Sequence, residues 1–349
     1  MISQYLRTFV AILFVINTLF FFFLLFKKAS TNLLNKRKKQ IKNLYEDSFL
    51  RFITDQTDEL PITPSTRLEQ QVIHSLFSEY SSVITRDKKR ALIETLGNAF
   101  IVKRVEKFLN SKNTWKQKAA TYWVGEYELS MFTDDLYHQL QTLDPELLFV
   151  TSKSLIKLTN DQFLSDILIT GTKRNRLSKS NLLALLDLVE GDISQALNEM
   201  MDEHDTYIQT IVLEAMGRRR YVEATTWIQS CLFESEKELK IAALKASRSL
   251  EYTGDDLFQS TLIDWVNDPD WEVRLFLSKY LQVMRNHRSI TMLTRLASDQ
   301  NWYVRYNASQ SLLAHGEEGI SALLSLLSAE DPFTQDIAYA TLQKEAIHI

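Results

Sequence analysis

The sequence contains few residues that break helices or cross-link a chain. Its 349 residues include only eight glycines and five prolines, while aliphatic and aromatic residues are plentiful, a composition that favours helices. Cys231 is the single cysteine, which excludes an intrachain disulfide, and we expect it to be one buried thiol in a helix. No stretch rich in proline and glycine divides the chain into two domains.

Acidic residues are missing from the first 45 positions, which carry eight lysines and arginines. Subtracting these eight from the 40 basic residues of the whole chain leaves 32 against 44 acidic residues, so the body from Glu46 onward has a net charge of −12. A body with this charge repels the phosphates of nucleic acids. We therefore expect no nucleic-acid partner.

Known catalytic motifs are also missing. The sequence has no His-Glu-x-x-His, Walker, Gly-x-Ser-x-Gly or dinucleotide-binding glycine pattern. His204 lies in an acidic cluster at 202–205, but consecutive helical residues point in different directions and no second set of ligands accompanies it. A solvated loop is favoured there over a metal site, and we predict no catalytic residue, no metal and no cofactor.

The longest hydrophobic run covers residues 9–26 and is interrupted only by Asn17 and Thr18. As a helix it would be about 27 Å long, close to the thickness of a bilayer's hydrocarbon core. Seven basic residues follow the run and only Arg7 precedes it, the reverse of the order in a cleaved signal peptide. We predict an uncleaved transmembrane anchor over residues 1–28 in the cell membrane, with the N-terminus outside and the remaining chain in the cytoplasm.

Residues 29–64 are predicted to form a basic juxtamembrane segment and an amphipathic helix. Apolar residues at 41, 44, 45, 49, 52 and 53 recur with a helical period. This apolar face could lie on the membrane or pack on the helices that follow, and packing is favoured because acidic residues come next. Pro61 and Pro64 then interrupt the chain, and a capping box from Thr66 to Glu69 begins the next helix.

The rest of the chain repeats one pattern. Residues 267–281 read N-D-P-D-W-E-V-R-L-F-L-S-K-Y-L, and their register recurs 31 residues later at 299–312. Proline and aspartate end one helix and begin the next. Apolar residues then occupy one helical face at 273, 276, 277, 280 and 281, and the preceding shorter helix has its own at 257, 262, 263 and 266. Such a hairpin cannot cover its own apolar side, and the fixed period indicates a stacked solenoid.

These residues resemble the short HEAT repeat that also occurs in phycobilisome-lyase-like proteins. Asp268, Val273 and Arg274 match its pattern, as do the residues at 299, 304, 305 and 308, whereas Ile337 replaces the arginine in the last copy, as suits a terminal cap. The resemblance implies an all-α, right-handed α-solenoid of stacked hairpins over residues 65–349, preceded by one transmembrane helix. It also implies that the arginine and the turn aspartate form a ladder between repeats.

The position of Arg274 serves as a marker for nine repeat units. The other eight markers are Arg90, Lys118, Phe149, Lys179, Gln209, Lys240, Arg305 and Ile337. The middle copies match the pattern least well.

In HEAT-like stacks the second helices line a concave face, where we expect a protein partner to bind. The predicted contact strip consists of Lys245, Arg248, Lys279, Gln282, Tyr306 and Gln310. Trp115, Trp271 and Trp302 each stand three residues before a marker. These tryptophans either staple a turn to the adjacent repeat, which is favoured, or form a second contact stripe, so Trp271 and Trp302 are also candidates for partner binding.

The main hypothesis is a membrane-anchored, cytoplasmic HEAT-repeat scaffold or adaptor that is not an enzyme. By family association it would be an accessory subunit of a membrane glycosyltransferase or export complex. The alternative is a HEAT-like enzyme, or a lyase-type handler of a chromophore or nucleic acid. HEAT-like metal-dependent hydroxylases need paired His-Glu dipeptides, which this sequence lacks. Helical-repeat DNA glycosylases need a basic groove, and the lyase resemblance supplies no chromophore-binding residue.

Overall fold

The computed structural model describes residues 2–54, 66–80, 101–173, 177–203, 206–231 and 234–346. Within these ranges the chain forms helices and no strand, which confirms the all-α prediction. The chain divides into two compact units, Met1–Leu129 and Ser130–Ile349. The expected break at Pro61 and Pro64, the marker Arg90 and the environment of His204 lie outside the described residues.

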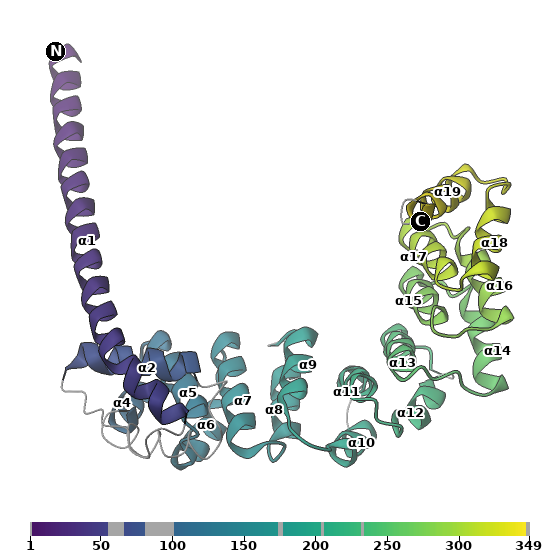
Figure 1. Cartoon of the computed structure of the whole chain (residues 1–349), viewed down its shortest axis with the longest axis horizontal. Coiled ribbons are helices and arrows are strands. Elements are labelled where there is room, and N and C mark those ends of the chain that lie inside the picture. The colour runs from purple at the N-terminus through teal and green to yellow at the C-terminus, as the bar shows by residue number, and fades with distance from the viewer. Residues whose placement is uncertain are drawn as a thin grey trace. The chain divides into compact units, whose positions relative to one another are not determined.

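The first unit begins with one continuous helix, α1 (Ile2–Ile53), shown in purple in Figure 1. The predicted span and the amphipathic helix belong to this one helix, because residues 27–41 contain no glycine or proline to end it. By length and composition its apolar part is sufficient to cross a membrane, and the phenylalanines at 20–23 are more than half exposed. No described part of the protein covers this apolar run.

The C-terminal end of α1 packs against α2 (Arg67–Tyr80) in the same unit. Phe49 and Phe52 of α1 are buried, and Lys42 Nζ contacts Glu79 Oε2 at 2.8 Å. The predicted capping box at the start of α2 is present: Thr66 N donates to Glu69 Oε2 at 2.9 Å and Glu69 N donates to Thr66 Oγ1 at 3.2 Å. Phe49 and Phe52 of the predicted apolar face therefore lie on protein, whereas Leu44 is exposed. Two further helices of this unit, α4 (Val102–Leu109) and α5 (Thr114–Glu126), pack on each other.

The second unit is a series of helical hairpins. Its helices are η2 (Ser130–Phe132), α6 (Thr133–Gln139), α7 (Pro145–Thr159), α8 (Leu164–Thr172), α9 (Lys179–Leu188), α10 (Ser194–Glu203), α11 (Thr206–Arg218), α12 (Ala224–Ser230), α13 (Lys237–Leu250), α14 (Asp256–Trp265), α15 (Trp271–Leu281), α16 (His287–Leu296), α17 (Trp302–Leu313), α18 (Glu317–Leu326) and α19 (Pro332–Ala346).

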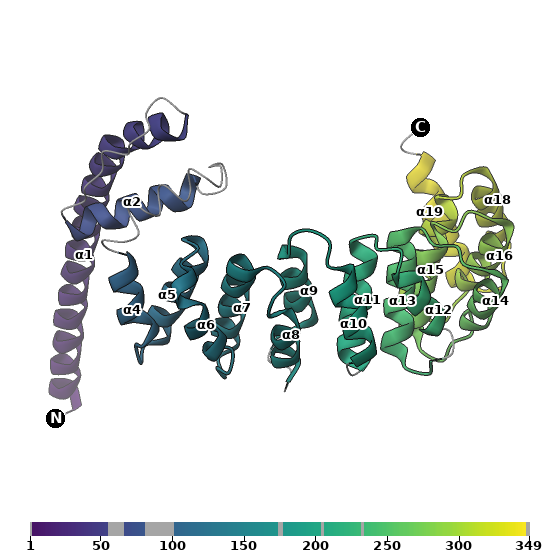
Figure 2. The same ribbon diagram turned by 90° about the horizontal axis from the view of Figure 1, so that it is seen from below.

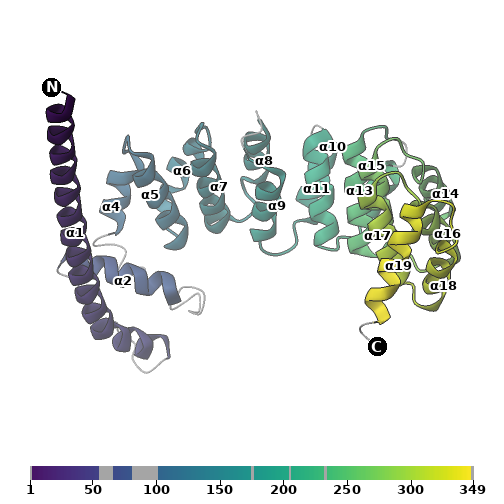
Figure 3. The same cartoon turned by 90° about the horizontal axis from the view of Figure 1, so that it is seen from above.

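The odd-numbered helices from α7 to α19 pack on one another in sequence order and form one layer of this unit. The even-numbered helices form the other layer, as Figures 2 and 3 show for α12 to α18. Along the green and yellow end of the unit, α13, α15, α17 and α19 lie on the inner side of the bend in Figure 1. We call the surface of this layer the odd-helix face. The markers from Phe149 to Arg305 all fall within the first five residues of an odd-numbered helix, as the repeat register predicts.

The core of each hairpin lies mainly between the two layers. Val273, Leu277, Tyr280 and Leu281 are fully buried, as predicted. The prediction was wrong for Phe276, which is only half-buried on the odd-helix face.

In α14 the predicted apolar face was half wrong. Leu262 and Val266 are buried, but Leu257 and Ile263 are exposed, and Phe258 and Trp265 take their place. The Phe258 ring packs on Tyr280 of α15 with centroids 6.0 Å apart, and Lys240 Nζ of α13 lies 5.8 Å from the centroid of the Trp265 ring. The predicted buried thiol is confirmed: Cys231 is 3% exposed at the C-terminal end of α12, and burial raises its pKa to about 11.

Leu277 and Leu257 offer a matched pair for testing the packing, since the first is 0% and the second 52% exposed. Replacing Leu277 with alanine should lower the free energy of unfolding by about 2–5 kcal/mol, because the neighbouring repeats would close only partly around the cavity. Leu257→Ala should change it by less than about 0.5 kcal/mol. Denaturant unfolding measures both, and equal losses for the two variants would contradict the packing described.

Candidate partner-binding face

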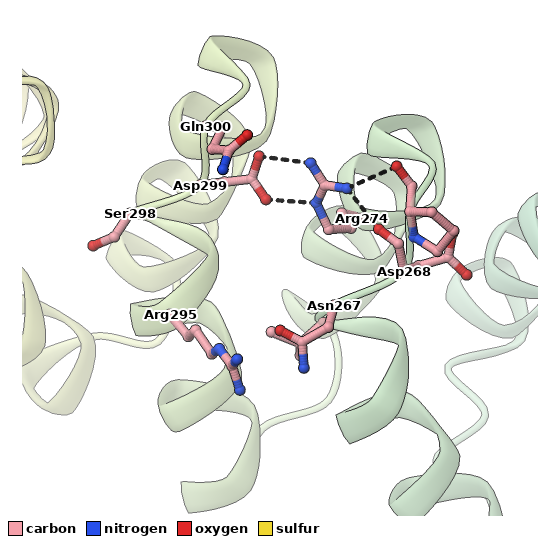
Figure 4. A pocket seen from close by; sticks show the side chains of 9 residues that line it. Asn267, Asp268, Arg274, Arg295, Ser298, Asp299 and Gln300 are labelled. Atoms are coloured by element: carbon pink, nitrogen blue, oxygen red, sulfur yellow. Dashed lines mark hydrogen bonds and ion pairs between the residues drawn. The ribbon is translucent and has the colours of Figure 1, made fainter.

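A ladder of charged side chains connects successive turns of the second unit (Figure 4). Arg274 donates from Nε to Asp299 Oδ2 at 2.6 Å and from Nη2 to Asp299 Oδ1 at 3.0 Å, a bidentate pair. The same guanidinium donates from Nη1 to the backbone oxygen of Asp268 at 2.6 Å. Arg274 therefore ties its own turn to the turn of the next repeat, as the resemblance to HEAT repeats implied.

The ladder continues on both sides of Arg274. Lys240 Nζ lies 2.7 Å from Asp268 Oδ2, one repeat earlier. Arg305 donates from Nη1 to the backbone oxygen of Asp299 at 2.7 Å. At the last turn the guanidinium of Arg305 lies over the ring of Phe333, 5.4 Å from its centroid. The ladder is therefore a structural element of the stack, in which Lys240 and Arg274 pair with the turn aspartates and, among the described residues, Arg305 hydrogen-bonds only to the backbone of its own turn.

The last turn depends on local hydrogen bonds. The Asp331 carboxylate accepts hydrogen bonds from the Thr334 hydroxyl at 2.7 Å and the Thr334 backbone N–H at 3.1 Å. The Thr334 hydroxyl is the largest cause of the lowered pKa of Asp331. The Asp331 side chain thus caps the start of α19, as Asp144 caps α7 and Asn301 caps α17.

The odd-helix face carries a buried carboxylate, Glu214 on α11, that three cations share. Lys245 Nζ lies 3.0 Å from Glu214 Oε2, Lys179 Nζ 3.2 Å from the same oxygen, and Arg218 Nη2 3.3 Å from Oε1. Burial alone would raise the pKa of Glu214, but Lys179 and Lys245 outweigh it and lower the pKa. Burial lowers the pKa of Lys179, because one shared carboxylate does not replace the water that this amine has lost.

Beside Glu214 lies a cavity of about 230 Å³ between α11, α13 and α15. It is lined by Glu214, Arg218, Leu244, Lys245, Arg248, Ser249, Phe276 and Lys279. The Phe276 ring lies between two amines: Lys245 Nζ is 4.9 Å and Lys279 Nζ is 5.1 Å from its centroid. Arg248 donates from Nη2 to Gln282 Oε1 at 3.0 Å.

Four of the six residues of the predicted strip therefore come together. Lys245, Arg248 and Lys279 line one cavity, and Gln282 is hydrogen-bonded to its edge. Their binding role stays a prediction.

The last two strip residues lie on α17 and contact α19. Gln310 Nε2 is 3.4 Å from the Thr341 hydroxyl, and Lys344 Nζ is 5.3 Å from the centroid of the Tyr306 ring. Both side chains are half-buried. The strip thus extends along the odd-helix face from α13 to α17.

Sequence reasoning missed Glu214, Arg218 and Phe276 as members of this site. A signal was present in the repeat spacing: Glu214, Lys245 and Lys279 follow one another at intervals of 31 and 34 residues, and Arg218, Arg248 and Gln282 at 30 and 34. Residues one period apart occupy equivalent places on adjacent odd-numbered helices. Aligning the polar positions of the second helices would have identified the cluster.

The tryptophans behave differently from one another. Trp271 stacks on Tyr303 of the next repeat, with ring centroids 5.9 Å apart. This contact agrees with the stapling interpretation. Trp302 is 51% exposed, and its ring lies 5.2 Å from the rings of Tyr303 and of Tyr306 in its own helix, so both of its interpretations stay predictions. Trp115, in the first unit, is 81% exposed.

The hollow of about 410 Å³ in Figure 4 is formed by the ladder itself together with Asn267, Arg295, Ser298 and Gln300. In the described ranges no three histidine, cysteine, aspartate or glutamate side chains gather as metal ligands would.

Comparison with known proteins supports the repeat class. A family model of HEAT repeats matches residues 259–343, so this segment of the chain consists of HEAT repeats. A search of curated proteins finds no match.

Two solved structures align with most of the chain but at low similarity. Human deoxyhypusine hydroxylase in complex with glycerol is 12% identical, over 87% of this chain and 96% of its own, with a TM-score of 0.29. An engineered protein is 16% identical, over 89% of this chain and 95% of its own, with a TM-score of 0.35. At these TM-scores neither alignment supports a conclusion about this chain.

The Arg274–Asp299 pair provides a test of the ladder. Arg274→Ala should lower the free energy of unfolding by about 2–3 kcal/mol. This loss is somewhat smaller than for breaking a fully buried pair, because the Arg274 side chain is 15% exposed. The double variant Arg274→Ala with Asp299→Ala should cost less than the sum of the single variants, since each single change leaves a charge without its partner.

The exposed pair of Arg288 and Asp256, 3.6 Å apart, is the control. Arg288→Ala should change the unfolding free energy by no more than about 0.5 kcal/mol. Strict additivity of the Arg274 and Asp299 variants would show that the bidentate pair does not couple the two repeats.

Proposed function

We propose that this protein is a membrane-anchored scaffold that binds a protein partner on its odd-helix face and is not itself an enzyme. The HEAT-repeat match over residues 259–343 supports a role in protein binding, because HEAT repeats generally mediate it. The observation that carries the proposal is the polar cavity beside Phe276, where side chains from three successive repeats converge on an open surface. Non-obligate interfaces commonly combine such polar groups with an aromatic residue.

The proposed anchor is the apolar run of α1. Its phenylalanine side chains are exposed, and burying them in lipid would recover their hydrophobic free energy. The basic residues that follow favour a cytoplasmic location for the two units. A scaffold held at the membrane would act on a membrane-associated complex, and an accessory role beside a glycosyltransferase or an export system fits this arrangement.

Topology can be measured with a reporter that is active only in the cytoplasm, fused after Ile349. We expect an active reporter and a protein that survives protease treatment of intact cells, because the basic residues after the span retain that side in the cytoplasm. Replacing these seven basic residues with glutamine should give mixed orientations. Release of a soluble, exported body by cleavage near Lys28 would contradict the anchor.

Binding can be tested with photo-cross-linking amino acids placed one at a time in cells. Gln282 and Tyr306 are the positions on the odd-helix face, and Leu257 and Leu324, which are exposed on the even-numbered helices, are the controls. We expect a discrete cross-linked protein from the first pair and none from the second. The same product from all four positions, or from the controls alone, would contradict a partner on the odd-helix face.

A further inference from the structure

The cavity beside Phe276 holds more positive than negative charge. Its lining includes four cations, Arg218, Lys245, Arg248 and Lys279, and one carboxylate, Glu214. The surplus is three positive charges at a single place on a body whose net charge is −12. Like charges confined together repel one another, so this arrangement is unfavourable for the free protein.

The one carboxylate of the cavity lining, that of Glu214, is already paired with other cations. Glu214 is shared among Lys179, Lys245 and Arg218, and Arg218 also contacts Asp187 Oδ2 at 3.1 Å. Arg248 and Lys279, by contrast, have no carboxylate within ion-pair distance among the residues that the structure describes. The pKa of Lys279 is lowered, first by burial and then by the charges of Arg248 and Lys245.

The geometry around these two cations suits a carboxylate. Gln282 accepts a hydrogen bond from Nη2 of Arg248 and so orients its guanidinium at the edge of the cavity. Lys279 Nζ is restrained over the Phe276 ring. A guanidinium and an amine on either side of a small cavity can bind one carboxylate through charge-assisted hydrogen bonds, while the ring contacts the methylene groups of an aspartate or glutamate side chain.

From these observations we infer that the partner presents an acidic peptide segment, whose carboxylates occupy the cavity between Arg248 and Lys279. This inference rests on the proposed function, because it specifies the chemistry of the partner that the odd-helix face binds. The acidic body favours a short acidic segment over a nucleic acid, since a long polyanion extending well beyond the cavity would be repelled. The cavity, of about 230 Å³, supplies cations for a carboxylate from its own lining.

The test is fluorescence anisotropy with the full chain in zwitterionic nanodiscs. The probe is a labelled short peptide of alternating glutamate and serine, and the control peptide alternates glutamine and serine. We expect the glutamate peptide alone to bind, and its affinity to fall as salt is raised from about 0.05 M to about 0.3 M, because exposed charges are increasingly screened.

Two double variants that change the net charge equally test whether the peptide binds in the cavity. Arg248→Glu with Lys279→Glu should weaken binding of the glutamate peptide at least about tenfold. Arg285→Glu with Arg295→Glu, at two exposed arginines outside the cavity, should leave the affinity within about twofold. Thermal unfolding checks that each variant is folded, and Arg248→Gln with Lys279→Gln replaces the first pair if that variant does not fold.

Three results would overturn the inference: no binding of the glutamate peptide, equal losses for the two double variants, or stronger binding of phosphate-bearing competitors. The competitors are a short DNA duplex and vesicles of equal parts phosphatidylglycerol and phosphatidylcholine. If cross-linking from Gln282 persists while the peptide fails to bind, the acidic class of partner is wrong and the proposed function stands. If both fail, the proposed function is wrong as well.

Discussion

Each hairpin of this protein has an apolar face that it cannot bury by itself, and the stack depends on satisfying that constraint. The odd-numbered helices α11 and α13 approach closely at Gly217, where an added Cβ would lie 2.5 Å from the Cα of Ala246. At this point there is no room for a residue larger than glycine. Near the same contact, Lys245 Nζ of α13 lies 3.0 Å from Glu214 Oε2 of α11.

Much of the fold could be predicted because the apolar period is a local property of the chain. Leu277 and Tyr280 follow it and are buried. Leu257 and Ile263 do not follow the prediction, because the rotation of α14 depends on its neighbours and a short amphipathic segment fits several rotations. The continuity of α1 follows from a different property: a change from apolar to charged residues does not end a helix, which requires a break in the backbone pattern such as proline or glycine.

The site was predicted only in part. The strip from Lys245 to Gln310 follows from the register of second helices, because equivalent positions face the same way. The role of Glu214 could not be read in the same manner, since its three cations come from α9, α11 and α13 and their distances depend on how the three helices pack. Phe276 was assigned to the core because hydrophobicity alone does not distinguish a core residue from an aromatic ring between two amines.

The continuity of α1 has a mechanical consequence for a protein held at a membrane. Between the end of the apolar run at Phe26 and the first contact of the helix with α2 at Lys42, the chain remains helical, a spacer of roughly 22 Å. An α-helix resists bending and twisting over this length, so the spacer would set both a height above the lipid and an angular phase. Each residue inserted into it would turn the packed end by about 100°. In the proposed anchor, the length of the spacer would therefore fix how far the first unit is held from the membrane, and its helical phase would fix the direction in which that unit faces.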